Sequence, residues 1–580
     1  MTAASRQERE ETTPLLGSSL KNYLTGSSSD SEEDRITILT SNPPSISDGK
    51  SSIHEHAEQQ QQPPQPEDIL ASRLNGASLL TILSGLWVAV SLASLDSSIV
   101  ATIYAQIGTE FKRSNEIVWV VTSYMLSYTA LQPLYGRISD VFGRKSALLF
   151  ATTLFFIGSL MCGAAPDLWT LVAARVVAGL GGGGINTLTT VICSDLVPLR
   201  ERGKYQGYGN IAYGVGSVVG APLGGFITDA FGWRFCFYIN LPFLLITVYI
   251  ATCVMTNYNL KERNDNSTLT ERLKKIDYLG AITVVSAVVC FMLATSMGGN
   301  LRPWSDPVVV GCLVASGVLA MIFCIVEAKV AQNPLMPWHI VSSQTPLACS
   351  LLNFWTLMAT MAAIYLVPLY LQGLLGKTPS QAGLYFFPKM VCSSVGSVLS
   401  GVWMSRTGEY KKATFVAACM SLLSMIGYSM WDRNTSIYLI AFCFAFDGFS
   451  LGVILTTALI AMLSCVESKD MATITSMSYL FRSVGSVIGI SATTAIFQAL
   501  VKSMLTEQIT GPDADKYIEI ARQSMNEIRE LLPPDVLAIV LDTYETALHY
   551  AFSSAILMAV LALISSLFIQ HYELATQLRK

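Results

Sequence analysis

Five ionisable side chains lie inside long apolar stretches of this sequence: Asp96, Arg175, Lys389, Asp447 and Arg482. A charged group at bilayer depth is costly unless it is paired or hydrated, so each one is a candidate for function. A buried carboxylate can take up a proton, and it can also bind a cation. These residue types therefore favour exchange of a proton for a cationic solute over a covalent reaction, and we expect no enzymatic activity.

The positions of these residues along their helices predict which of them meet. Counting about 1.5 Å of rise per residue, Asp96 and Arg175 fall in the same half of the membrane, and Asp447 and Arg482 both fall near its middle. We expect one acid–base pair in each half of the protein. Protonation of Asp96 would release Arg175, and a cationic substrate could compete for the same carboxylate. Two alternatives stay open: both pairs are purely structural, or Asp447 only neutralises Arg482. Lys389 is near one end of its span and is expected to reach toward the interface.

The composition indicates the kind of element that holds these charges. The chain is 51% hydrophobic and 13% charged, whereas a soluble protein has roughly 25% charged residues. Its apolar residues come in runs of about 18 or more, the length that spans a hydrocarbon core. We predict an all-α polytopic membrane protein with about fourteen spans. Their expected centres are Trp87, Met125, Phe155, Val177, Val218, Leu245, Val288, Ser316, Met361, Ser394, Leu422, Thr456, Val487 and Met558.

The loops predict the orientation. Lysine and arginine gather in alternate junctions, for example at Arg144, Lys145 and Lys411. Because basic loops face the cytosol, both termini are expected there. We predict a disordered tail over 1–74, a six-helix half over 75–256, a linker with two extra spans over 257–345, and a second six-helix half over 346–580 with a luminal loop over 501–548.

The chain also repeats itself. Val215-Gly-Ser-Val-Val-Gly220 is similar to Val484-Gly-Ser-Val-Ile-Gly489, and GRISDVFGRK (Gly136–Lys145) is echoed by GVWMSRTGEYKK (Gly401–Lys412). We therefore predict two six-helix pseudo-repeats with two helices inserted between them. Parallel repeats place a substrate site at mid-membrane where the two halves meet.

These segments resemble motifs of the major facilitator superfamily. GRISDVFGRK resembles its loop signature, and Leu95-Asp-Ser-Ser-Ile-Val100 resembles the LDxTIV signature of its fourteen-span drug:proton antiporter family. Arg175 in its glycine-rich stretch is similar to the proton-coupling arginine motif, and Gly232–Pro242 is similar to the GWRWIFYINLP stretch. Within that family the chain looks most like fungal vacuolar basic amino-acid transporters. The resemblance implies the major facilitator fold and proton coupling at Asp96 and Arg175.

Regularly spaced glycines mark the stretch GVGSVVGAPLGG, from Gly214 to Gly225. Every fourth residue from Gly216 to Gly224 is a glycine, and such a stripe lets a neighbouring helix approach closely in lipid. A proline in the same stretch bends the helix. The resemblance makes this the antiporter motif, with members Gly214, Gly216, Gly220, Pro222 and Gly224.

Two further groups of residues complete the expected site. In the loop signature, Asp140 can pair with Arg137 and Arg144 and hold one orientation of the two halves, although a purely topogenic role for the basic residues is the alternative. This gating loop comprises Gly136, Arg137, Asp140, Gly143, Arg144 and Lys145. The expected substrate cavity comprises Asp96, Asp447, Arg482, Asn210, Tyr213, Asn353 and Tyr365.

The N-terminal tail carries a candidate sorting signal. Glu11-Thr-Thr-Pro-Leu15-Leu16 resembles the acidic dileucine signal that adaptors read when they sort proteins to vacuoles, so a sorting adaptor is an expected partner. The cysteines lack metal-ligand spacing, and there is no GxxxxGK[ST] phosphate loop. We expect no metal, no cofactor and no nucleic-acid partner.

Together these features predict a proton-coupled antiporter that moves basic amino acids (Lys, Arg, His) across the vacuolar membrane into the lumen. Its expected partners are the small-molecule substrate, protons and the lipid bilayer. One alternative is a multidrug or siderophore exporter of the plasma membrane. The other, from a different class, is a nutrient receptor that does not transport.

Overall fold

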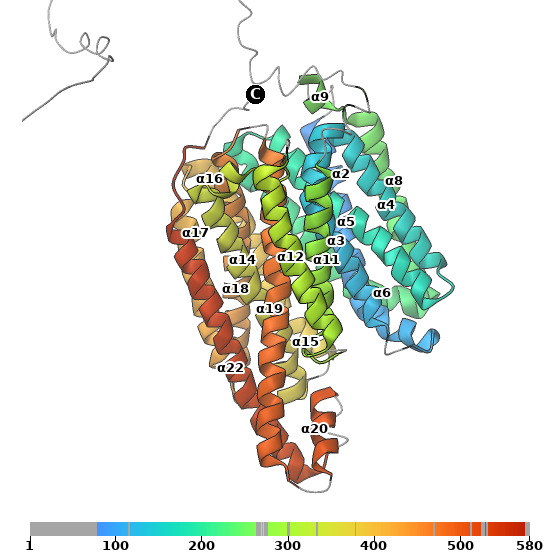
Figure 1. The fold of residues 1–580 in the computed structure, drawn as a ribbon, viewed down its shortest axis with the longest axis vertical. Helices are drawn as coiled ribbons and strands as arrows, with labels where there is room; N and C mark the ends of the chain where they lie inside the picture. The colour runs from blue at the N-terminus through green and yellow to red at the C-terminus, as the bar shows by residue number, and fades with distance from the viewer. Residues whose placement is uncertain are drawn as a thin grey trace, which may run out of the picture. The chain divides into compact units, whose positions relative to one another are not determined.

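A computed structural model describes residues 78–574, apart from 114–115, 263–267, 269–270, 272–276, 299–301, 332–333, 378, 468–469, 511–512, 524–527 and 529–531. The described elements are all helical (Figure 1). They are α2 (Leu79–Glu110), α3 (Val118–Phe142), α4 (Arg144–Ala164), α5 (Leu168–Leu196), α6 (Leu199–Phe231), α7 (Phe235–Tyr238), α8 (Asn240–Tyr249), η1 (Ile250–Val254), α9 (Tyr258–Glu262), α11 (Tyr278–Met297), α12 (Pro307–Lys329), α13 (Trp338–Val341), α14 (Gln344–Pro368), η2 (Leu369–Leu374), α15 (Pro379–Tyr385), α16 (Phe387–Thr407), α17 (Lys411–Ser429), α18 (Ile437–Ser464), α19 (Met471–Gln508), α20 (Ala514–Gln523) and α22 (Pro534–Leu567).

The prediction of an all-α polytopic membrane protein is confirmed. Over the described residues, 12 helices are long and apolar enough to cross a membrane, and 13 if the bent helix α6 is counted as one span. α6 bends by 43° between Gly220 and Pro222, where the proline removes a backbone donor. The remaining expected span is α3, which is less apolar because it carries polar side chains such as Ser123, Ser127 and Gln132.

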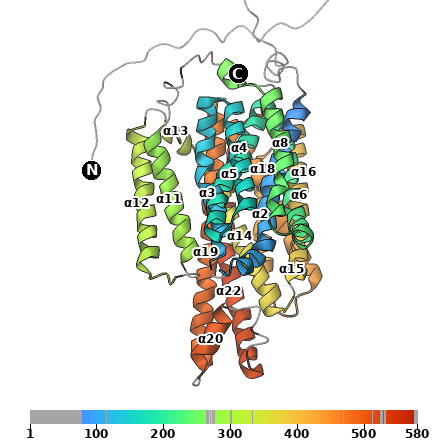
Figure 2. The same ribbon diagram turned by 90° about the vertical axis from the view of Figure 1, so that its right-hand side faces the viewer.

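The helices form two bundles that meet along two seams. In the first bundle α6 packs on α2, and α5 packs on α3 and α4; in the second, α16 packs on α18, and α14 packs on α19 and α22. The seams between them are α6 against α16 and α3 against α19. Figure 2 shows the two inserted helices, α11 and α12, standing beside the bundles.

Contacts between the two bundles gather at one end, which we call the basic end because Arg144, Arg200 and Lys411 lie there. A Cβ atom at Gly136 of α3 would collide with the Ala472 carbonyl oxygen of α19, and one at Gly401 of α16 would collide with the backbone of Gly203 on α6. Glycine is needed at these crossings because the backbones approach so closely. The basic end is therefore closed.

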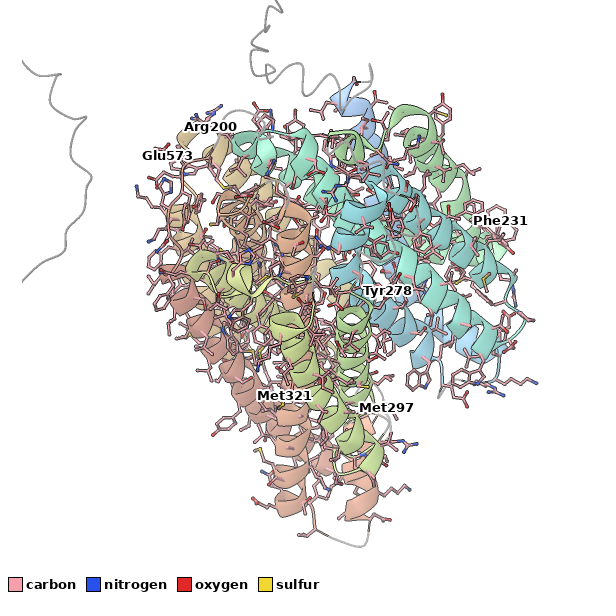
Figure 3. The ribbon with its side chains drawn as sticks, turned by 45° about the horizontal axis from the view of Figure 1, so that its top comes forward. Arg200, Phe231, Tyr278, Met297, Met321 and Glu573 are labelled. Carbon is pink, nitrogen blue, oxygen red and sulfur yellow. The ribbon has the colours of Figure 1, made fainter. Side chains whose placement is uncertain are left out.

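The inserted helix α11 lies across the seam between α3 and α19. In Figure 3 it runs from Tyr278 to Met297 in front of both bundles. Val288 and Met292 of α11 form an apolar cluster with Ala130 of α3, and Val487 of α19 packs against it. α12 packs on α11 and leaves most of its own apolar surface exposed. The hairpin thus covers the seam and faces lipid.

The opposite end, which we call the far end, is built from helix extensions. α20 packs on α19 beyond the membrane span and buries Ile518, while the Tyr544 hydroxyl of α22 donates to the Ala521 carbonyl. The described residues of the expected loop over 501–548 thus include α20 and the ends of α19 and α22. At the end of α2, hydrogen bonds from Arg234 and Trp233 lower the pKa of Glu110.

Candidate functional site

The first bundle holds a sealed ion pair between α2 and α5. Arg175 Nη1 lies 2.6 Å from Asp96 Oδ2, and both side chains are 1% exposed. Asn240 of α8 donates to the other carboxylate oxygen at 3.3 Å. The guanidinium also lies over the Tyr124 ring, 4.0 Å from its centroid, and its Nε donates to the Val120 carbonyl. The structure thus brings Asp96 and Arg175 together as the sequence predicts.

The second bundle holds a different pair from the one predicted. Asp447 of α18 bonds Lys389 of α16, with Nζ and Oδ2 2.5 Å apart, and both are buried. Tyr428 donates to the same oxygen at 3.1 Å, and Thr360 to the other at 3.5 Å. Pairing of Asp447 with Arg482 is therefore wrong, and so is the expectation that Lys389 only reaches for the interface. Lys389 faces inward because α16 crosses α18 closely at Gly448.

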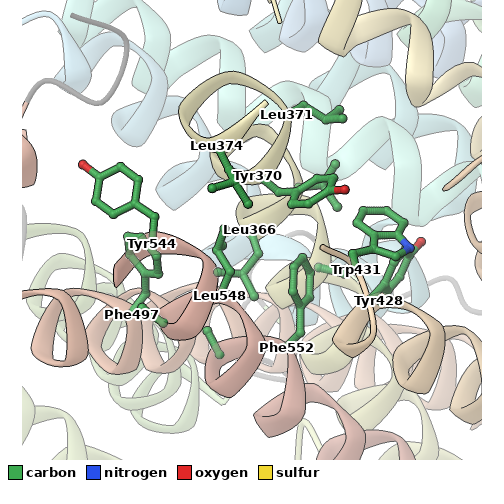
Figure 4. Close-up of a cluster of buried hydrophobic side chains, with 14 of the residues drawn as sticks. Leu366, Tyr370, Leu371, Leu374, Tyr428, Trp431, Phe497, Tyr544, Leu548 and Phe552 are labelled. Carbon is green, nitrogen blue, oxygen red and sulfur yellow. The ribbon is translucent and has the colours of Figure 1, made fainter. Parts of the chain in front are cut away.

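An apolar cluster of the second bundle covers this Lys389–Asp447 pair. Figure 4 shows Tyr428 and Trp431 beside Phe552 and the turn η2. The Tyr428 ring lies 4.8 Å from that of Trp431 and 5.8 Å from that of Phe444, centroid to centroid. The Tyr428 hydroxyl points out of this cluster toward Asp447. The packing excludes water, which strengthens the ion pair and makes loss of either partner costly.

Arg482 stands alone among the predicted charges. Its Nε donates to Asn353 Oδ1 of α14 at 3.3 Å, and its Nη2 donates to the Leu455 carbonyl of α18 at 2.8 Å. No carboxylate of the described residues forms an ion pair with it. Asn353 in turn donates to Ser478. The arginine is held in place by neutral groups and stays half-buried at the seam.

The other expected cavity residues occupy different places. Asn210 of α6 donates to Ser397 of α16 at 2.7 Å and so crosses the seam between α6 and α16. Tyr213, also on α6, lies within hydrogen-bonding reach of Ser94 of α2 and is 45% exposed. Tyr365 of α14 is half-buried beside Thr494 of α19. Asn210 and Tyr213 face the region between the bundles, whereas Tyr365 packs inside the second bundle.

The glycine stripe of α6 packs on the helix that carries Asp96. A Cβ at Gly216 would collide with the Ser91 carbonyl oxygen of α2, and one at Gly220 would come within 2.8 Å of the Leu95 carbonyl oxygen. The hydroxyl of Ser98 closes the same contact by donating to the Ser217 carbonyl at 2.7 Å. The matching glycines of α19, Gly485 and Gly489, pack in the same way on α14. Gly224 continues this contact toward Thr102 and Ile99 of α2, whereas a Cβ at Gly214 would meet Ser394 of α16.

The loop between α3 and α4 forms a buried charge network within the first bundle. Gly143 has φ of +97°, a left-handed value that glycine adopts readily. Arg144 bonds Asp140 at 2.8 Å and Asp195 of α5 at 2.7 Å, and Lys145 donates to the Thr252 carbonyl. These pairs lie within the first bundle, and the close contact of the loop signature with the second bundle is that of Gly136 with α19.

The sequence of residues 86–490 matches the family model described as Major Facilitator Superfamily. The chain belongs to the major facilitator superfamily. The expected fold class and family are thereby confirmed, as is the absence of enzymatic chemistry, because members of this superfamily are transporters.

Three fungal relatives illustrate where the chain lies within the superfamily. It is 38% identical over 501 residues to the multidrug resistance protein fnx1 of Schizosaccharomyces pombe, covering 86% of this chain and 93% of the relative. It is 36% identical to the vacuolar membrane amino acid uptake transporter fnx2 of the same yeast, covering 86% and 85%. It is 29% identical to vacuolar basic amino acid transporter 2 of Saccharomyces cerevisiae, covering 77% and 96%.

Several residues of this transporter site were not found from the sequence. Arg200 of α6 donates from Nε and Nη2 to the last carbonyls of α16, those of Ser405 and Arg406, at 2.8 and 3.0 Å. The helix C-terminus favours such a cation, so Arg200 links the two bundles through these hydrogen bonds. Asn240 lies in the Gly232–Pro242 stretch, but nothing in the sequence indicates that its side-chain amide contacts Asp96. The sorting residues Glu11, Leu15 and Leu16 lie outside the described residues.

The glycine stripe yields a prediction with a matched control on the same helix. Gly220→Ala places a methyl group against Ser98 and the Leu95 carbonyl, which forces α2 away at a cost of about 1–3 kcal/mol. We expect slower substrate exchange and a proton leak in reconstituted vesicles. Gly225→Ala, whose Cβ meets nothing within 4 Å, should behave like the wild type. A lower protein level with unchanged coupling in Gly220→Ala contradicts a role in movement.

Proposed function

We propose that this major facilitator transporter exchanges protons for basic amino acids and fills the vacuolar lumen with them. The observation that carries the proposal is the Asp96–Arg175 pair, buried in the first bundle without solvent contact. A carboxylate in such a place can bind a proton only when the surrounding helices move. That dependence on conformation links proton binding to the opening of the protein.

The proposed cycle uses both ends of the molecule. With basic loops in the cytosol, the closed basic end is cytosolic, and both termini lie on that side. A luminal proton that reaches Asp96 displaces Arg175, and breaking this pair favours separation of Gly136 from α19 and of Gly401 from α6. The bundles then rock about the mid-membrane site. An acidic lumen drives the proton outward and the cationic substrate inward.

The amino-acid substrate and the vacuolar membrane are supported by similarity. Two of the relatives above are named as vacuolar amino-acid transporters, one of them for basic amino acids. The candidate dileucine signal at Leu15 and Leu16 adds a route to the vacuole through a sorting adaptor. Deleting this pair should redistribute the protein to the cell surface, measured by imaging a fluorescent fusion.

The test is uptake of labelled lysine by vacuolar vesicles with and without this protein. We expect ATP-dependent acidification to drive uptake, and a protonophore to abolish it. Arginine and histidine should compete with lysine, whereas a neutral sugar should not. Vesicles that acidify normally but accumulate no additional lysine when the protein is present would contradict the proposal.

A second candidate is favoured by the relative named as a multidrug resistance protein, which is 38% identical. In that case the same coupling would serve export of organic cations at the plasma membrane. Cells lacking the protein would then become sensitive to cationic drugs while vacuolar lysine stayed unchanged. A receptor that does not transport would show neither effect.

A further inference from the structure

We propose that Arg482 binds the carboxylate of the transported substrate. The substrate is then an amino acid recognised at its acid end, not any organic cation of suitable size. The positive charge on the substrate's side chain is taken from the proposed function. The binding of the substrate's carboxylate by Arg482 does not depend on that function.

The bonding of Arg482 leaves one edge of its guanidinium unused. Arginine has five N–H donors in a planar fork. The contacts with Asn353 and Leu455 engage Nε and one hydrogen of Nη2, so both hydrogens of Nη1 have no partner among the described residues. A fork of this kind matches the two oxygens of a carboxylate. The residue is thus oriented by neutral groups and is still free to take an anion.

Arg482 lies at the contact between the two bundles and is not fully buried. Arg482 is half-buried, and its guanidinium lies 5.3 Å from the Tyr479 ring centroid. The Tyr479 hydroxyl bonds Thr190 of the first bundle at 2.8 Å. Tyr213, on a different helix of the first bundle, is close enough to Tyr479 for electrostatic interaction and yet is 45% exposed. The Arg482 guanidinium therefore lies beside Tyr479, a residue that itself bonds across to the first bundle.

Among the described residues, no acid forms an ion pair with Arg482. The two acids buried at membrane depth already have bases of their own, Asp96 with Arg175 and Asp447 with Lys389. An arginine at membrane depth without an acid is costly, and the cost falls when an anion arrives. The two acids are sealed, so neither offers its carboxylate to a substrate in this conformation. The substrate carboxylate is the group that the site lacks.

The tyrosines around this position suit the other end of a basic amino acid. Tyr128 of α3, Tyr213 of α6 and Tyr479 of α19 are electrostatic neighbours of one another. Their ring faces attract an ammonium or guanidinium group. A zwitterion with a cationic side chain would therefore place its carboxylate on Arg482 and its side-chain charge against the tyrosines, without a free aspartate.

The first test compares substrates that differ only in the carboxylate. Lysine exchange is measured in vesicles reconstituted with the full protein and without a proton gradient, in competition with lysine, lysinamide or cadaverine. Lysinamide and cadaverine lack the carboxylate that would pair with Arg482. Loss of such a charged hydrogen bond weakens binding by roughly tenfold or more, so both should compete at least tenfold more weakly than lysine. Arg482→Gln should remove the difference, and Arg482→Lys should restore part of it. Equal competition by cadaverine in the wild type overturns the inference.

A second measurement separates this inference from the proposed function. The melting temperature of the purified protein is recorded with matched pairs: lysine and cadaverine, arginine and agmatine, leucine and isopentylamine. We expect the acid-bearing member of at least one pair to stabilise the wild type more, and Arg482→Gln to lose that preference. Arg433→Gln, a far-end arginine bonded to Asp542 and Glu545, should keep it. If the protein prefers the acid-bearing compounds but does not exchange lysine, the proposed function fails and this inference stands. If the acid-bearing member is not preferred in any of the three pairs, the inference is overturned.

Discussion

Replacing Asp96 by asparagine will abolish proton-driven lysine uptake. The variant keeps a side chain that Asn240 can still reach, but it cannot bind and release a proton. It also leaves Arg175, which is 1% exposed, without its counter-charge. Uptake should fall to the level of vesicles without the protein, measured with labelled lysine and an internal pH indicator. Lysine exchange without a proton gradient should persist, because it needs no net proton movement.

The stability of this variant requires its own control. Breaking a buried ion pair costs about 3–5 kcal/mol, so loss of uptake by Asp96→Asn could reflect unfolding. The double variant Asp96→Asn/Arg175→Gln removes both charges and should recover most of the melting temperature while staying uncoupled. Asp542→Asn, at an exposed aspartate of the far end, should transport normally. Full proton-driven uptake by Asp96→Asn would show that the pair is only structural.

The second large effect concerns the Lys389–Asp447 ion pair, which the sequence analysis did not predict. Lys389→Met should destabilise the protein by about 3–5 kcal/mol, because it leaves Asp447 buried among Tyr428, Thr360 and apolar rings. In a double-mutant cycle, Lys389 and Asp447 should be coupled by about 0.5–3 kcal/mol, whereas Arg482 and Asp447 should be additive within about 0.5 kcal/mol. The readout is the melting temperature in detergent for each single and double variant. A stronger coupling of Asp447 to Arg482 than to Lys389 contradicts the geometry.

The two bundles use similar backbones to hold different charges. Gly179 and Gly183 of α5 let α3 approach at the Tyr124 and Tyr128 carbonyls, and Gly448 and Gly452 of α18 let α16 approach at the Lys389 and Ser393 carbonyls. Tyr124 and Lys389 therefore occupy equivalent places. In the first bundle that place holds a ring beneath Arg175, and in the second it holds the base itself. The two sealed pairs at membrane depth, one in each bundle, are thus built from different helices.

The sequence by itself determined the class, the family and the position of each charge along its helix. Apolar runs of sufficient length can only be helices in lipid, since every backbone group must be bonded internally. The glycine spacing near Gly220 predicted a close helix contact, and the depth of Asp96 and Arg175 predicted their pairing. These inferences succeed because they depend on distance along one chain segment and on the composition of each span.

Only the tertiary structure decided which partner each buried charge meets. Depth along a helix says nothing about rotation around its axis, and two helices at the same depth can face away from one another. Lys389 turns inward because Gly448 lets α16 come close to α18, whereas Arg482 faces Asn353 and the seam. The sequence pointed to both residues. The packing made one of them a structural base and left the other free to bind an anion.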